Sequence, residues 1–123
     1  GQLHHVAFHH DGTQNAFLCV SGFCGSVSTM SLSACGATAL HVGSSMLGGG
    51  NVHFSGSIDE LRVSQMWRYS PNGHYSPPNQ PFSSDGQTIV LHHFDSAVPT
   101  TLDVPNAYTF TLAGSAGISS SPF

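Results

Sequence analysis

The chain has 123 residues, of which 39% are hydrophobic and only 7% are charged, with a net charge of −4 and no lysine. This length suits one domain, the charge excludes nucleic-acid binding through a basic face, and the lack of an apolar run of about 18 residues excludes a membrane-spanning helix. A surface so poor in charge is weakly protected against association, so we expect neighbouring molecules, sugars or other domains to cover it.

The first third of the chain predicts short β-strands. Apolar and polar residues alternate over residues 3–10, residues 16–20 are a second strand candidate, and "DGTQN" between them starts at the Asp-Gly pair that is typical of a tight turn. Alternation returns over residues 27–32 and 38–43. Residues 44–51 include three consecutive glycines and are expected to form a loop.

The longest predicted strand is "VHFSGSIDELRV", residues 52–63. Its alternation changes phase, because Phe54 and Ile58 share one parity whereas Leu61 and Val63 share the other. Such a change predicts a β-bulge near residues 59–60, which would turn a charged side chain inward.

The proline-rich segment of residues 70–86 is expected to form an irregular surface strap, because its four prolines cannot donate ladder hydrogen bonds. Residues 88–94 and 108–114 read as further strands. Helical periodicity is nearly absent, and strands at this spacing predict an all-β antiparallel sandwich.

Three cysteines leave one over after any pairing. Cys24 and Cys35 flank a serine-rich segment, and we predict a disulfide between them. Cys19–Cys24 across the "VSGF" turn is the alternative pairing. A further alternative is that all three cysteines are buried free thiols. A disulfide would indicate an extracellular setting.

The stretch "SGSIDELRVSQMWRYS", residues 55–70, holds both positive residues of the chain. We expect Glu60 to pair with Arg62 or Arg68, because an unpaired charge near a core is costly. Asp59 and Glu60 are adjacent, so on a regular strand they point to opposite faces and not toward one substrate, as the two carboxylates of a retaining glycosidase must. We therefore predict no catalytic residues and no enzymatic activity.

Aromatic residues near the strap are candidates for stacking on sugar rings, namely Trp67, Tyr69 and Tyr75. The alternative is that they pin the strap to the sheets, because a proline-rich segment with few backbone bonds needs apolar anchors. Six of the nine histidines form adjacent pairs, at positions 4–5, 9–10 and 92–93. Without the spacing of a zinc motif, they are expected to be hydrogen-bonded or sheet-surface histidines.

Several segments in order resemble the second half of a laminin-G-like jelly roll of the concanavalin A-like lectin/glucanase superfamily: "HHVAF", "AFLCVSG", "LHVGSS", "FSGSIDELRVS" and "WRYSPNGHYSPPNQPF". "GSIDELRV" together with "RYSPNGHYSPPNQPF" is the most specific part. Leu3 stands where the family usually has tryptophan, Cys19 where tyrosine is common, and Ser21 where aspartate is common.

The resemblance implies that residues 1–84 are the C-terminal half of such a domain, with the strap at 70–86. Residues 85–123 resemble its opening strands, in permuted order or from a next repeat. A window from a tandem array, a permuted or strand-exchanging unit and a piece of a longer chain all fit this order. The implied fold is an antiparallel jelly-roll sandwich that is incomplete, permuted or strand-exchanged.

Some members of the resembled family bind calcium, which implies Asp59, Asp95 and Asp103 as candidate Ca²⁺ ligands, with turn capping as the alternative role. The function that the resemblance implies is a non-catalytic extracellular adhesion or structural module, at a cell or virion surface, that binds glycans or copies of itself. A carbohydrate-processing enzyme or its lectin-like accessory domain is the alternative.

Overall fold

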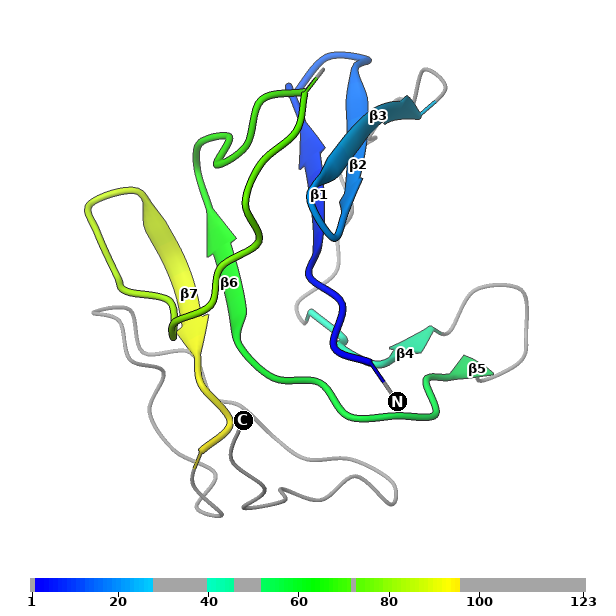
Figure 1. The fold of residues 1–123 in the computed structure, drawn as a ribbon, viewed down its shortest axis with the longest axis vertical. Coiled ribbons are helices and arrows are strands. Elements are labelled where there is room, and N and C mark those ends of the chain that lie inside the picture. Colours follow the sequence, from blue (N-terminus) through cyan, green and yellow to red (C-terminus); the bar gives the residue numbers. More distant parts are fainter. Residues whose placement is uncertain (1, 28–39, 46–51, 72, 96–123) are drawn as a thin grey trace.

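The structure, a computed structural model, describes residues 2–27, 40–45, 52–71 and 73–95. Over these residues the protein consists of short antiparallel strands without a helix, which confirms the predicted all-β class. None of the described residues forms a helix of the length and apolarity that crossing a membrane requires. Figure 1 shows three small sheets, with the strap running between the two upper ones.

The largest sheet has the order β1-β2-β3 and comprises β1 (Val6–His10), β2 (Ala16–Val20) and β3 (Phe23–Val27). β2 matches its predicted bounds, and β1 covers the second part of the strand predicted over residues 3–10. A carboxylate closes the β1–β2 loop: Asp11 Oδ1 accepts hydrogen bonds from the backbone nitrogens of Thr13 and Asn15, at 2.8 and 3.1 Å.

The β2–β3 connection is a two-residue turn at Ser21 and Gly22, whose φ angles are 47° and 101°. Positive φ at both positions is the type I′ pattern, whose twist matches that of the flanking strands. β3 therefore starts at Phe23, earlier than the strand predicted over residues 27–32, of which residues 28–32 lie outside the described part.

The tight turn also determines which two cysteines form the disulfide. Cys19 lies directly opposite Cys24 in the β2–β3 register, and the two are disulfide-bonded. The predicted Cys24–Cys35 bond is therefore wrong, and the alternative pairing is the one formed. The physical reason is that a two-residue turn already places Cys19 against Cys24; Cys35 lies outside the described residues.

The strand predicted over residues 52–63 is wrong as one element. β5 (Val52–His53) pairs with β4 (Ser44–Ser45), and β6 (Leu61–Ser64) starts only after Glu60, whose φ is 58°. A left-handed residue interrupts the extended chain, so a break in the strand falls where the bulge was predicted. A shift in the β6–β7 register follows further on, between Val63 and Ser64. β4 also occupies part of the predicted loop, and residues 40–43 form no strand.

β7 (Thr88–His92) pairs antiparallel with β6, with Leu61 opposite His92, and confirms most of the strand predicted at 88–94. The buried apolar side chains among the described residues are few: Ala16, Cys19 and Leu91. Within the described part of residues 70–86 a single bridge, from His74 to Phe23, interrupts the irregular path, as predicted for a strap. The strand predicted at 108–114 lies outside the described residues.

Replacing both Cys19 and Cys24 with alanine is expected to lower the free energy of unfolding by about 2 kcal/mol, the loop-closure value for so short a loop. The measurement is urea unfolding without reductant, with Cys35→Ala as the control that retains the Cys19–Cys24 bond. An equal loss of stability in the control, or peptide mapping that links Cys24 to Cys35, would contradict this pairing.

Candidate functional site

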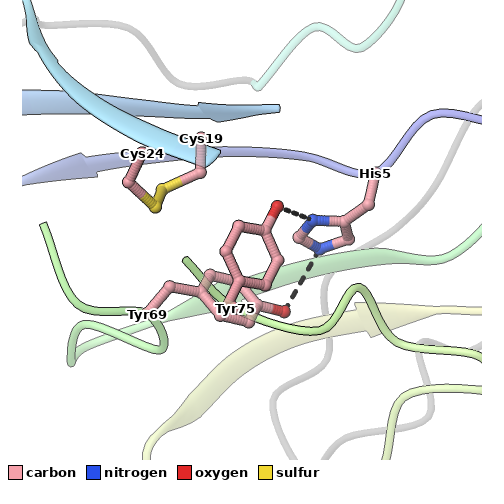
Figure 2. Close-up of a disulfide and its surroundings, with 5 residues drawn as sticks. All are labelled: His5, Cys19, Cys24, Tyr69 and Tyr75. Atoms are coloured by element: carbon pink, nitrogen blue, oxygen red, sulfur yellow. Dashed lines mark hydrogen bonds between the residues drawn. A yellow bond between two sulfur atoms is a disulfide. The ribbon is translucent and has the colours of Figure 1, made fainter. Parts of the chain in front are cut away.

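A histidine bridges the hydroxyls of two neighbouring tyrosines where the strap meets β1, beside the disulfide (Figure 2). The His5 ring nitrogens hydrogen-bond the hydroxyls of Tyr75, at 2.6 Å, and Tyr69, at 3.1 Å. Burial, and then the positive charge of Arg62, lower the pKa of His5. The ring is thus held neutral, so one nitrogen donates to a tyrosine oxygen and the other accepts from a tyrosine hydroxyl.

Both of these tyrosines are partly buried, and their ring centroids lie 4.2 Å apart. Burial also raises the pKa of Tyr69. Their hydroxyls and ring faces are engaged within the protein, which favours the anchoring role over sugar stacking for Tyr69 and Tyr75.

The strap docks directly on the tight turn of the first sheet. The Tyr75 backbone nitrogen donates to the carbonyl of Gly22 at 2.9 Å, and the Cys24 nitrogen donates to the carbonyl of Gly73 at 3.2 Å. A Cβ at Gly22 would lie 2.8 Å from the Tyr75 carbonyl oxygen. Position 22 therefore needs glycine twice, for its positive φ and for the close approach of the strap.

The other end of the strap is held at Phe82. The Phe82 nitrogen donates to Glu60 Oε2 at 2.8 Å, and the Arg62 guanidinium carbon lies 4.4 Å from the centre of the Phe82 ring. The other Glu60 oxygen, Oε1, lies 2.7 Å from His93 Nδ1, which donates to it. This contact joins the start of β6 to the end of β7.

The predicted pairing of Glu60 with Arg62 or Arg68 is therefore wrong. The left-handed backbone at Glu60 directs its carboxylate to His93 and the strap, while Arg62 covers the face of Phe82. A cation over an aromatic face contributes about 0.5–2 kcal/mol, so Arg62 is engaged without a carboxylate.

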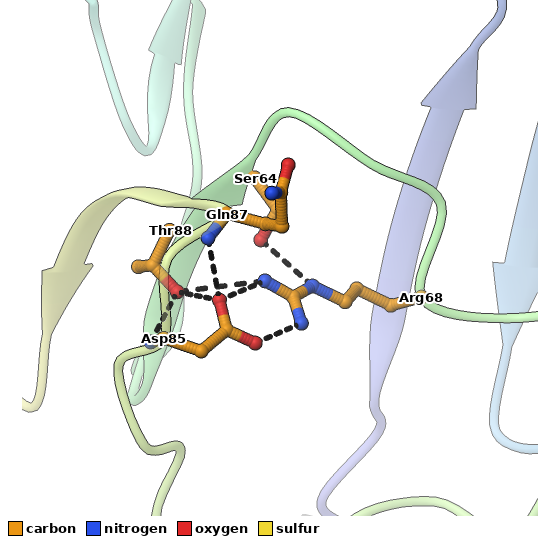
Figure 3. A network of polar contacts seen from close by, with 5 residues as sticks. All are labelled: Ser64, Arg68, Asp85, Gln87 and Thr88. Atoms are coloured by element: carbon orange, nitrogen blue, oxygen red, sulfur yellow. Dashed lines mark hydrogen bonds and ion pairs between the residues drawn. The ribbon is translucent and has the colours of Figure 1, made fainter.

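Arg68 is a structural ion-pair residue as predicted, but its partner is Asp85 (Figure 3). The two make a bidentate contact, with Nη1–Oδ2 at 2.5 Å and Nη2–Oδ1 at 2.8 Å. The Arg68 hydrogen bonds, followed by those from Gln87 and Thr88, hold the pKa of Asp85 well below its usual range. Sequence reasoning missed Asp85, because an Asp-Gly pair before a strand indicates only a turn.

A cleft of about 380 Å³ lies between the end of β1 and the turn after β6. Trp67 borders it, 39% exposed, with its ring edge-on to Phe17 at a centroid distance of 5.4 Å. His9, which also lines the cleft, is buried, and its Nε2 has no hydrogen-bond partner in the described structure. The lining residues are Phe8, His9, His10, Asp11, Ser64, Gln65, Met66 and Trp67.

Two of the three candidate calcium ligands interact electrostatically. The pKa of Asp59 is raised, first by burial, then by Glu60, with a smaller contribution from Asp95. Within the described ranges no group of three or more His, Cys, Asp or Glu is placed to hold a metal, and Asp103 lies outside them. Two carboxylates fall short of the six to eight oxygens that Ca²⁺ takes. The calcium site stays a prediction.

One face of the β1-β2-β3 sheet is mostly apolar and mostly exposed, and we call it the open face; the register also places His10 and the buried Ala16 on it. The register places five large apolar side chains on it, each between 41% and 65% exposed: Val6, Phe8, Leu18, Val20 and Phe23. The opposite face carries the buried Cys19 and His9, and His9 packs against Trp67 and Tyr69. The sequence analysis did not predict the open face. A signal was present, because "AFLCV" is a continuous apolar run, which is typical of a strand with apolar side chains on both faces.

Comparisons of the chain with protein-family models, with curated proteins and with solved structures find no match. The residues and contacts described above therefore carry the functional reasoning.

Lowering the pH from about 7.5 to about 5 is expected to destabilise the fold through His5 and His9. Burial lowers both pKa values in the folded state, whereas imidazoles of the unfolded chain titrate near 6.5. This stability is complete above about pH 6.5 and is lost as the pH falls through that value toward the lower folded pKa. Urea unfolding at a series of pH values measures the slope. His5→Gln should flatten it, and a change at the exposed His41 should not.

Replacing Asp11 or Asp59 with asparagine is expected to change the melting temperature in opposite directions. Asp11→Asn should lower the melting temperature by a few degrees, because the carboxylate accepts hydrogen bonds from Thr13, Gln14 and Asn15. Asp59→Asn should raise it in metal-free buffer at pH 7, because burial and neighbouring carboxylates oppose the charge. Thermal melting in EDTA checks both, and a lower melting temperature for Asp59→Asn would contradict this account.

Proposed function

We propose that the protein is a non-catalytic adhesion or structural module of the laminin-G-like jelly-roll type, working outside the cell or on a cell or virion surface. The open face is the observation that carries this proposal. Sheets with one uncovered apolar face are completed by a second packed layer, so the module works by surface complementarity. The Cys19–Cys24 disulfide supports an oxidising compartment.

The pairing of β7 with β6 supports the permuted order over a next repeat. β7 belongs to the segment that resembles the opening of the domain, and β6 to the "IDELRV" strand of its second half. Their pairing within one chain is what the resemblance would require of a permuted unit.

The engagement of the acidic side chains supports a non-catalytic role. Glu60 is bound to His93 and to the Phe82 nitrogen, and Asp85 is bound to Arg68. A retaining glycosidase needs two carboxylates that face one cleft about 5–5.5 Å apart. The cleft described above contains a single carboxylate, Asp11, whose oxygens accept hydrogen bonds from its own loop.

Glycan binding at the cleft is a second candidate role, favoured by Trp67. This residue is the one stacking candidate that borders the cleft, and the face of its indole suits a pyranose ring. Binding on a glycan array that is lost in Trp67→Ala and kept in Tyr75→Phe would support this role. Dependence of that binding on calcium would bring in the predicted site at Asp59, Asp95 and Asp103.

Incubation with a panel of polysaccharides is expected to release no reducing ends above buffer, with Glu60→Gln indistinguishable from the parent protein. The reason is that Glu60 is a structural clasp. Circular dichroism confirms that the variant is folded. Release of reducing ends by the parent protein that Glu60→Gln abolishes would overturn the proposal in favour of a carbohydrate-processing enzyme.

A further inference from the structure

The cleft between the end of β1 and the turn after β6 is lined by a buried histidine with an unpaired nitrogen. His9 is 8% exposed, and its Nε2 makes no hydrogen bond within the part of the chain that the structure describes. Burial lowers the pKa of His9, so the ring is neutral at pH 7, with one nitrogen that donates and one that accepts. An unpaired buried polar group destabilises a fold, and native proteins hold few of them. At the wall of a cleft, such a group indicates a ligand that completes its hydrogen bonding.

Trp67 supplies a fixed aromatic surface beside this histidine. Its ring makes edge-to-face contacts with Phe17 and His9, at centroid distances of 5.4 and 6.4 Å, and its Nε1 donates to the His10 carbonyl at 3.4 Å. These contacts hold the ring in place although the residue is 39% exposed. A side chain that is fixed before binding loses little conformational freedom when a ligand stacks on it.

The polar side chains around the cleft suit hydroxyl groups. Ser64 Oγ accepts a hydrogen bond from Arg68 Nε at 3.0 Å, so the Ser64 hydroxyl proton remains to be donated. The Gln65 amide both donates and accepts, and the Asp11 carboxylate accepts. A sugar hydroxyl also donates and accepts, so it matches this mixed lining, which a hydrocarbon ligand would leave unpaired.

The charge of the cleft disfavours acidic ligands. Hydrogen bonds from Thr13 and Asn15 hold the pKa of Asp11 well below its usual range, so its carboxylate is ionised at pH 7. None of the described residues that line the cleft is an arginine, and the chain has no lysine. Arg68, which contacts Ser64, is paired with Asp85, so its charge is offset. A ligand with a carboxylate or a sulfate would therefore be repelled by Asp11.

From these observations we propose that the cleft binds a neutral pyranose and discriminates against sugars that carry a carboxylate. The ring stacks on Trp67, and a ligand hydroxyl hydrogen-bonds His9. The cleft volume of about 380 Å³ lies at the lower end of the roughly 300–1,000 Å³ of small-molecule sites, which suits a short glycan. This inference rests on the glycan-binding role proposed above and names its ligand class and the hydrogen-bonding residue.

Matched pairs of methyl glycosides test the charge preference. Trp67 is the only tryptophan of the chain, so intrinsic fluorescence reports binding at the cleft directly. The probes are the methyl glycosides of glucose, galactose and mannose, each beside its uronic acid, at low salt and up to about 50 mM, well above a millimolar dissociation constant. At least one hexoside should give a saturable change, and its uronide should bind roughly tenfold more weakly. Added salt or Asp11→Asn should narrow this difference, because each reduces the repulsion.

His9→Phe tests the hydrogen bond, because it keeps an aromatic ring and removes both nitrogens. The affinity for the hexoside should fall by about fivefold to tenfold, the value of one neutral hydrogen bond. The melting temperature should stay the same or rise, because an unpaired buried nitrogen is removed. His9→Gln, which retains a hydrogen-bonding group, should keep most of the affinity. His41→Phe, at an exposed position away from the cleft, is the matched control that should leave the affinity unchanged.

Circular dichroism checks that these variants fold. If His9→Phe does not, Trp67→Ala takes its place, and saturation-transfer NMR with the same hexoside should show that binding is lost. The inference is overturned by a parent protein that binds no hexoside or binds uronides as tightly. A folded His9→Phe with the parent affinity, or with a lower melting temperature and no change in affinity, overturns it too, because His9 would then be structural only.

These results separate this inference from the proposed function. A protein that binds no hexoside, or prefers uronides, and releases no reducing ends overturns the neutral-sugar site and leaves the non-catalytic module standing. Reducing-end release that depends on Glu60 overturns the module proposal itself, whatever the cleft binds.

Discussion

The anchoring of the proline-rich strap is the constraint on which the rest of the described structure depends. A segment with four prolines between residues 70 and 86 cannot be held by a ladder of backbone hydrogen bonds. Two backbone hydrogen bonds to the first sheet, at Gly73 and Tyr75, are joined by side chains that hold it at three places. These are His5 near the first sheet, Glu60 and Arg62 around Phe82, and Arg68 with Asp85. The strap thereby joins the β1-β2-β3 sheet to the β6–β7 pair and substitutes for the direct packing of one on the other.

The few charged side chains of the protein take part in the same arrangement. Both arginines and two of the six acidic residues, Glu60 and Asp85, are used to hold the strap or the ends of strands. What remains on the open face is apolar, and such a surface has only weak protection against association. This arrangement fits the proposed contact with other surfaces, because both arginines are engaged within the protein.

The β2–β3 hairpin shows how much of the structure the local sequence can predict. "AFLCVSGFC" contains the apolar strand, the Ser-Gly turn and the two cysteines that the turn brings opposite each other, so the local sequence includes Cys19–Cys24 among the possible pairings. Composition around Cys24 and Cys35 favours their pairing, whereas the strand register brings Cys19 opposite Cys24. At Glu60 local sequence was insufficient, because its left-handed backbone and its contact with His93 depend on a partner 33 positions away.

Sequence by itself determined the all-β class, the position of β2, most of β1 and β7 and the irregular course of the strap, since these follow from alternation, glycine and proline, which act within a few residues. The tertiary structure alone decided which carboxylate meets which cation, that His5 joins Tyr69 and Tyr75, and that one apolar sheet face stays open. Those outcomes depend on which distant segments contact each other in the folded protein, and the spacing of residues along the chain does not specify these contacts.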